Sequence, residues 1–322
     1  MNLAFDPGYG NIKLFGPEGG LVMQSAVAVA GGARIRRMTG LRVSRPPKCV
    51  QTGNGRFYTG EGAHDWGRPV ENLDFGRLSG SPEMLALFLG AISRYGVPPD
   101  PLNLIVGLPI TTLMGENAVR TQNDVKAFLQ GVHTWEVDGV VCNVVVESVK
   151  VTSQPVGAMF DFLLTDEGEM PLDRRLAFRG EIGILGIGMN TLDLLVVRNG
   201  TPVQRFTAGE TLGVRRLLEL MNNGGYSLAE MDTQLRAGSL NTANLLSVWE
   251  SEVLGFVERS WGVSFRRYSR VVITGGGAKL LRKSLLLRFK DKAFVPDEPI
   301  IATARGLFKY TRKLGRRTER GG

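Results

Sequence analysis

The first residues with chemical potential lie in the segment FDPGYGNIKLF, residues 5–15. Apolar residues lead into Asp6, the turn Pro-Gly-Tyr-Gly follows, and polar and apolar residues then alternate around Lys13. This pattern predicts strand, tight turn and strand, because glycine accepts the positive φ angles of hairpin turns. The amides of such a turn form a concave set of donors that can hold phosphate. A hairpin by itself requires neither the acid nor the lysine.

Asp6 and Lys13 gain a purpose if the turn holds phosphate. Gly8 and Gly10 would allow close approach of a ligand, and Lys13 would offer a positive charge to phosphate oxygens. The Asp6 carboxylate repels phosphate, so we expect it to hold Mg²⁺, largely through water. On this motif alone, an ordinary structural turn stays open as the alternative.

Two further glycine segments strengthen the phosphate interpretation. GILGIGMNTLDLL, residues 183–195, repeats strand, turn and strand, and Gly186 aligns with Asp6 at an offset of 180 residues. The repeat predicts two lobes of like construction with their turns facing one another. TGGGA, residues 274–278, closes a buried strand and opens a helix, where bare backbone can lie flat against a nucleoside. Lys279 after it lacks the spacing and the Ser or Thr of a Walker A motif.

Composition argues against several other classes of protein. A chain of 322 residues has room for two lobes. With only two histidines and two cysteines, and no CxxC pair, a zinc site has almost no support. No apolar run approaches the ~20 residues that span a bilayer, and no secretory signal is present, so we expect a cytoplasmic protein.

The net charge of +8 is concentrated between residues 266 and 320. A basic face of this kind can bind DNA by neutralising phosphates. A solvated surface with a basic tail is the favoured explanation, because no helix-turn-helix or aromatic-interleaved pattern accompanies the charge. Direct DNA binding therefore stays open.

Alternating patterns predict an α/β fold with layered sheets. We expect strands at 102–108, 135–137 and 140–147, and a polar connection at 167–180. The expected helices are 81–95, 115–130, 155–164, 212–221, 228–236, 241–261 and 301–313.

Five segments occur in a fixed order: DPGYGNIK, VGLPI, SQPVGA, GIGMNTLD and TGGGA. In this order they resemble the actin-like ATPases, most of all the ParM/StbA plasmid-segregation group and its archaeal actin-like relatives. The resemblance covers residues 3–310. It implies the actin/hexokinase/heat-shock ATPase fold, with two ribonuclease-H-like lobes around a nucleotide cleft. Lobe I would be residues 1–154 completed by a C-terminal helix at 301–322, and lobe II would be residues 155–300.

The resemblance also implies site residues for Mg²⁺ with ATP or GTP. Asp6 would hold the metal, and the catalytic set would be Gln154, Asp6 and Asp193. Gln154 occupies the place of the residue that orients the attacking water; an amide aligns water but does not take its proton. Capping of its own helix is the alternative role of Gln154. The nucleotide-binding set would be Gly8, Tyr9, Gly10, Asn11 and Lys13, then Gly188, Met189, Asn190 and Thr191, then Gly209 and Glu210, and finally Gly275, Gly276, Gly277 and Ala278.

Gly186 departs from the family pattern, since relatives begin the second phosphate loop with an aspartate that helps to hold the magnesium waters. Nucleotide binding survives this change more easily than hydrolysis does. The resemblance thus implies an ATPase that self-associates into filaments and positions plasmid DNA or other cargo, with a DNA-bound adaptor as partner and slow hydrolysis unless another acid substitutes. The alternatives are a small-molecule kinase of the same superfamily, for which we find no catalytic aspartate or sugar site, and a non-hydrolysing scaffold.

Overall fold

The computed structural model describes residues 1–31, 39–40, 42, 45–72, 74–98 and 101–320. The chain forms two compact units. Unit 1 comprises Met1–Val106 and Val119–Val151, and unit 2 comprises Gly107–Ala118 and Thr152–Gly322. This division differs from the expected lobes mainly in the last helix, α11 (Ala302–Arg320), which belongs to unit 2.

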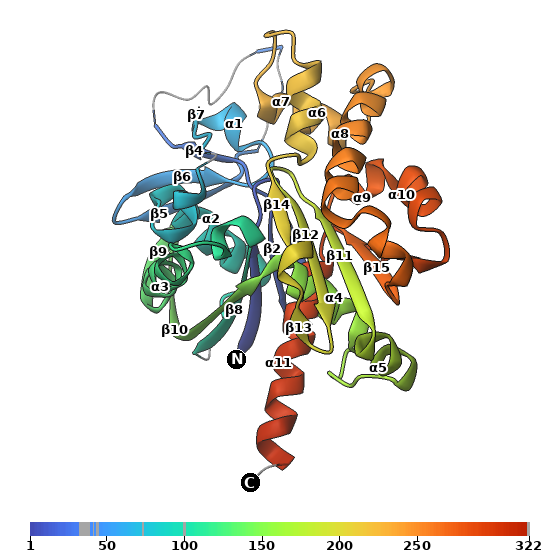
Figure 1. Cartoon of the computed structure of the whole chain (residues 1–322). Coiled ribbons are helices and arrows are strands. Elements are labelled where there is room, and N and C mark those ends of the chain that lie inside the picture. Colours follow the sequence, from blue (N-terminus) through green and yellow to red (C-terminus); the bar gives the residue numbers. More distant parts are fainter. Residues whose placement is uncertain (32–38, 41, 43–44, 73, 99–100, 321–322) are drawn as a thin grey trace. The chain divides into compact units, whose positions relative to one another are not determined.

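Unit 1 is built on a ten-stranded sheet with the order β3-β2-β1-β8-β10-β9-β5-β6-β4-β7 (Figure 1). β1 pairs antiparallel with β2 and parallel with β8. β1 is buried along almost its whole length, which explains its near-continuous apolar sequence. The strands are β1 (Asn2–Pro7), β2 (Asn11–Gly16), β3 (Gly19–Gln24), β4 (Val27–Val29), β5 (Lys48–Thr52), β6 (Gly55–Thr59), β7 (Arg68–Pro69), β8 (Leu102–Leu108), β9 (Gly131–Val137) and β10 (Val140–Ser153).

Helix α2 (Pro82–Tyr95) covers part of this sheet and begins as the sequence predicts. The Ser81 side chain accepts a hydrogen bond from the Met84 amide at 3.2 Å, and Pro82 occupies the first turn, where its missing N–H costs nothing. The other helices of this part of the chain are α1 (Ala63–Trp66) and α3 (Ala118–Leu129).

Unit 2 repeats the central arrangement of unit 1. Its sheet has the order β13-β12-β11-β15-β16, with β14 paired to β12. β11 pairs antiparallel with β12 and parallel with β15, as β1 does with β2 and β8. The predicted likeness of the two hairpin units, 180 residues apart, is therefore confirmed at the level of strand pairing. The strands are β11 (Glu181–Ile187), β12 (Leu192–Arg198), β13 (Thr201–Pro202), β14 (Ala208–Glu210), β15 (Arg270–Thr274) and β16 (Ala293–Phe294).

Helices cover both faces of the unit 2 sheet. Alternate residues of β11 enter different cores: Ile184 packs with residues of α4 (Gln154–Leu163), and Leu185 packs with residues of α8 (Ala243–Trp261). Trp249 and Trp261 of α8 are fully buried, and each indole N–H donates to a backbone carbonyl. The remaining helices are α5 (Leu172–Arg179), α6 (Val214–Met221), α7 (Leu228–Arg236), α9 (Gly277–Leu280) and α10 (Arg282–Phe289).

The connection expected at residues 167–180 is wrong, because Leu172–Arg179 forms α5. Pro171 precedes this helix, Asp173 lies in its first turn and Arg179 in its last, an order that complements the helix dipole. Its Ala177 and Phe178 pack against the α4 side of the core. Within the described residues, no helix combines the length and apolar character that a membrane crossing needs.

Helix α11 lies against α4 (Figure 1). The two helices approach each other at Gly157 of α4 and Gly306 of α11. A Cβ on Gly306 would collide with the Gly157 carbonyl, so the helices approach more closely than side chains allow. Beside the crossing, Arg305 donates twice to the buried Asp161, at 2.7 and 2.8 Å, and Lys309 lies 3.2 Å from the same carboxylate. These contacts hold the C-terminal helix in unit 2.

The crossing predicts unequal effects of substitution along α11. Gly306→Leu should destabilise unit 2 by about 1–3 kcal/mol or more, because the added atoms meet backbone that cannot move aside. Gly315→Ala is the matched control, since Gly315 is exposed with open space around it and alanine favours a helix by up to ~1 kcal/mol. Urea unfolding followed by tryptophan fluorescence measures both; equal shifts would contradict the close crossing.

Candidate functional site

The first glycine hairpin, between β1 and β2, pairs its two charged residues with each other. Asp6 and Lys13 are opposite residues in the strand register, and Lys13 Nζ lies 2.9 Å from Asp6 Oδ2. The Asp6 side chain is only 2% exposed and that of Lys13 13%. Burying an unpaired carboxylate would be costly, and the pairing with Lys13 offsets that cost for Asp6. The acid and the lysine thus have a structural role beside any role toward a ligand.

The backbone of this turn is fixed from inside unit 1. A Cβ on Gly8 would lie 2.7 Å from the Asn11 carbonyl oxygen, so only glycine fits there. The Gly8 carbonyl accepts hydrogen bonds from Ser25 Oγ at 2.6 Å and from Arg77 Nη2 at 3.4 Å. Because a peptide group is planar and trans, its C=O and N–H point in opposite directions. The Tyr9 amide is therefore directed away from Ser25 and Arg77.

Sequence reasoning did not identify Arg77. It lies in the short 3₁₀ helix Phe75–Ser79, is 6% exposed, and stacks its guanidinium 4.0 Å from the centre of the Tyr9 ring. Burial lowers the pKa of Arg77, while Tyr9 and Glu83 oppose that shift. A single arginine in so short a helix gives no periodic or motif signal, so only the folded chain reveals this contact.

The second hairpin, between β11 and β12, is fixed by backbone alone. The carbonyls of residues 188–190 accept hydrogen bonds from the amides of residues 213–215 at the start of α6, with N···O distances of 2.7–3.2 Å. A Cβ on Gly213 would collide with the Met189 carbonyl. In the described part of the chain, the amides of residues 189–191 donate to no backbone carbonyl. Consecutive amides without backbone partners are the kind of donors that can bind phosphate.

Asp193 follows this turn and is buried, with 3% of the residue exposed. Its Oδ1 accepts from the Ile110 amide at 3.2 Å, and its Oδ2 accepts from Thr191 Oγ1 at 3.3 Å. Gly209 lies opposite Asp193 in the register with β14, where a Cβ would collide with the Thr111 methyl group. Asp193 therefore ties the VGLPI segment to the second hairpin.

The three glycines of the loop after β15 differ in whether packing requires them. Gly275 has φ +92°, and its amide donates to the Pro299 carbonyl at 2.8 Å. A Cβ on Gly277 would collide with the Ile187 side chain. Gly276 has φ −64° and open space where a side chain would stand. The fold requires Gly275 and Gly277, whereas Gly276 leaves bare backbone that packing does not demand.

The glycine loop and the second hairpin are neighbours in unit 2. Thr274 at the end of β15 lies opposite Gly186 near the end of β11. A Cβ on Gly186 would make only ordinary contacts, the nearest being Asp193 Cβ at 3.8 Å. Gly186 therefore has room for a Cβ, and a carboxylate at this position would lie across the strand pair from the buried Asp193.

The other predicted residues lie at the margins of these segments. Gln154 is the first residue of α4, directly after the N-cap Ser153, and is partly exposed. Glu210 is exposed at the end of β14, and its carboxylate accepts from the Thr211 amide at 3.0 Å. Ala278 is fully buried in α9. In the described ranges, no three His, Cys, Asp or Glu side chains cluster to hold a metal ion.

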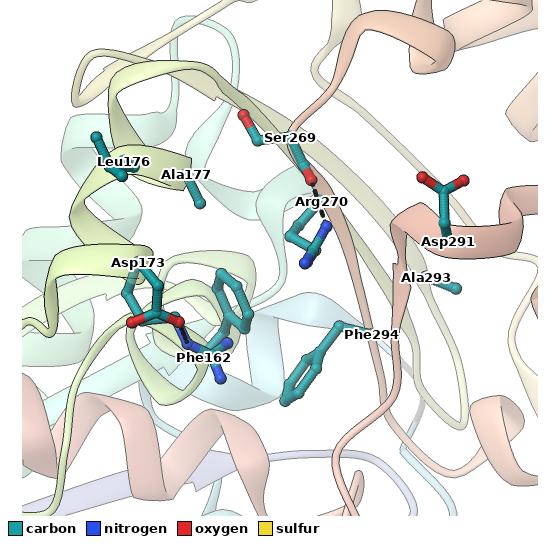
Figure 2. A pocket seen from close by; sticks show the side chains of 10 residues that line it. Phe162, Asp173, Leu176, Ala177, Ser269, Arg270, Asp291, Ala293 and Phe294 are labelled. Atoms are coloured by element: carbon teal, nitrogen blue, oxygen red, sulfur yellow. Dashed lines mark hydrogen bonds and ion pairs between the residues drawn. The ribbon is translucent and has the colours of Figure 1, made fainter.

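A cavity of about 540 Å³ in unit 2 contains none of the predicted site residues (Figure 2). Its lining includes Ser269 and Arg270, at the opposite end of β15 from the glycine loop. Arg174 stacks 4.1 Å from the Phe162 ring centre and pairs with Asp173 at 3.0 Å. Two arginines and two aspartates line the cavity, so its formal charges balance and favour neither anion nor cation.

The comparisons with known proteins agree with the observed fold. Residues 4–157 match the family model of the actin-like proteins' N-terminal domain. No curated protein sequence matches the chain.

Solved structures match over nearly the whole chain. The apo psk41 ParM protein is 17% identical, with a TM-score of 0.73 and coverage of 99% of this chain and 98% of its own. An archaeal actin homologue in complex with ADP is 17% identical, with a TM-score of 0.73 and coverage of 98% and 99%. A 15-stranded ParM filament from Clostridium botulinum is 18% identical, with a TM-score of 0.74 and coverage of 97% and 99%. Residues 4–157 are therefore similar to the N-terminal domain of the actin-like proteins, and the chain has the actin-like fold over its length.

Proposed function

We propose that this protein binds Mg-ATP, or Mg-GTP, through its two glycine hairpins and its glycine loop, and assembles into nucleotide-dependent filaments that position plasmid DNA or other cargo. The observation that carries the proposal is the turn at residues 188–191, whose carbonyls are all bound internally. That arrangement directs its amides outward as a phosphate-binding array. The ADP bound to the archaeal homologue and the filament formed by the Clostridium botulinum ParM support the same conclusion.

The residues divide the binding task by chemistry. The amides of the two turns would hold phosphate oxygens, and Lys13 would add a positive charge on the first side. The bare backbone at Gly276 would lie against the nucleoside. Gln154 would orient the attacking water, and Asp193 would support the second turn through Thr191.

Asp6 suits Mg²⁺ in one specific way. It is a buried carboxylate beside the turn, and in the described residues no cluster of three ligating side chains exists. Mg²⁺ keeps several waters and commonly uses one or two carboxylates together with substrate phosphates, so a single aspartate is a sufficient protein contribution. The bound metal would neutralise charge on the phosphates.

Filament formation follows from head-to-tail contacts. Such contacts join different faces of identical chains and do not close on themselves, so open polymers result. A DNA-bound adaptor could then link the polymer to its cargo.

Replacing Gly276 with a large side chain should weaken nucleotide binding and filament assembly together. Gly276→Leu should leave the fold intact, since space is open and the φ angle suits any residue, but it should weaken ATP binding about tenfold or more and remove ATP-promoted polymer. Gly53→Leu is the control, because Gly53 also has open space but lies between β5 and β6. Calorimetry and sedimentation with Mg-ATP measure the two effects. A protein that stays monomeric with every nucleotide would contradict the filament proposal.

Gly186 favours a second candidate, a nucleotide-binding scaffold that hydrolyses slowly or not at all. Of the two expected acids, only Asp6 is present. Gly186 has no side chain where the family pattern places a carboxylate. Placement of the metal waters and stabilisation of transition-state charge would be weaker as a result.

Adding the missing carboxylate should separate the two candidates. Gly186→Asp should raise phosphate release by roughly one to two orders of magnitude, about the contribution of a positioned catalytic group. The Cβ has room, and Gly186→Asn is the control, because it supplies the same shape without a second charge opposite Asp193. Phosphate release at matched polymer mass is the measurement. Fast turnover in the unaltered protein would show that Gly186 does not limit hydrolysis.

A further inference from the structure

The two hairpin turns are held by different means. In the second, the amides at the start of α6 bind the turn carbonyls. In the first, two side chains bind the Gly8 carbonyl: Ser25 Oγ at 2.6 Å and Arg77 Nη2 at 3.4 Å. Unit 1 therefore holds the Gly8 carbonyl with replaceable side chains, while the Ser25 amide donates to the Gly10 carbonyl at 3.1 Å.

Arg77 is poorly explained by folding alone. Its guanidinium is buried, and among the described residues Nη1 and Nη2 donate only to the neutral carbonyls of Asn72 and Gly8. Its Nε is buried without a hydrogen-bond partner in the part of the chain that the structure describes. The nearby Glu83 carboxylate instead accepts from Asn72 Nδ2 at 2.7 Å. A buried cation with incomplete hydrogen bonding costs stability, and an apolar side chain of similar length would avoid that cost.

The contacts of Arg77 with the first hairpin turn indicate a role other than stabilising the fold. It touches the turn twice, at the Gly8 carbonyl and over the Tyr9 ring at 4.0 Å. The peptide that joins these two residues is therefore held at its oxygen and flanked by the stacked ring. Rotation of that peptide would break the hydrogen bonds of both Ser25 and Arg77.

We propose that Arg77 and Ser25 are positioning residues for phosphate binding: by holding the Gly8 carbonyl inward they aim the Tyr9 amide at the phosphates of a bound nucleotide. This inference rests on the proposed nucleotide-binding function. It predicts that losing either donor weakens the binding of phosphate groups and spares the binding of the nucleoside.

The test compares ATP with adenosine on the full chain. Arg77→Lys keeps the charge but loses the planar fork and its stacking, and Ser25→Ala removes the second donor. Each should weaken ATP binding about tenfold, the effect of ~1.4 kcal/mol, and leave adenosine affinity unchanged. The double variant should lose less than the product of the two factors, because both donors serve one acceptor. Calorimetry measures ATP, and ligand-observed NMR measures adenosine.

Arg94→Lys is the matched control. Arg94 is also a partly buried arginine of unit 1 that donates to backbone carbonyls, to Thr59 at 2.6 Å and Gly90 at 3.2 Å, and burial likewise lowers its pKa. Those partners lie in β6 and α2, not in the hairpin. Arg94→Lys should lower the melting temperature and leave the ratio of ATP to adenosine affinity unchanged.

Two outcomes would overturn the inference. The ratio of ATP to adenosine affinity could stay unchanged in Ser25→Ala and Arg77→Lys, whether or not both ligands weaken, or Arg94→Lys could change the ratio as much as Arg77→Lys does. If Arg77→Lys does not fold, Ser25→Ala alone decides. An unaltered protein that binds neither ligand would overturn the proposed function itself, and the inference with it.

Discussion

The orientation of a few peptide groups at two hairpin turns governs the rest of the candidate site. Carbonyls that face the protein interior must be hydrogen-bonded, and both turns meet this requirement from within their own units. At residues 188–190 the partners are the amides that begin α6, and at Gly8 they are the side chains of Ser25 and Arg77. Since a trans peptide points its N–H away from its C=O, satisfying the carbonyls inside directs the amides outward. In the proposed function, the phosphate-binding donors are these backbone amides, held by backbone in unit 2 and by the side chains of Ser25 and Arg77 in unit 1.

The glycines around the second hairpin show how tightly packing constrains the site. Gly209, Gly213 and Gly275 each lie where a Cβ would collide with a neighbouring segment. Gly276 and Gly186 are different, because both have room for a side chain. A glycine-rich motif therefore contains two kinds of position: glycines that packing requires, and glycines where a side chain would fit. Only the latter can be substituted to probe function without disturbing the fold.

Charged residues in this protein likewise combine structural and functional roles. The two carboxylate oxygens of Asp193 accept hydrogen bonds from the Ile110 amide and the Thr191 hydroxyl. Asp193 therefore links the segment that contains Ile110 to the second hairpin. Asp6 is paired with Lys13, so the hairpin is neutral before any ligand arrives. A ligand that recruits Lys13 would release the Asp6 carboxylate at the same time. Lys13 thus takes part both in the ion pair with Asp6 and in the proposed binding of a magnesium nucleotide.

The sequence by itself determined the hairpins, the helix α2 and the strands β8 and β15, because periodicity and glycine turns are local signals. The ordered motifs also indicated the actin-like fold, which the family model and the solved structures confirm. Helix α5 was missed because its polar sequence buries no residue fully. The roles of Arg77, Ser25 and Asp193 were decided only by tertiary structure. Their partners lie 69, 17 and 83 residues away in the chain, and no local pattern encodes a contact between segments that folding alone brings together.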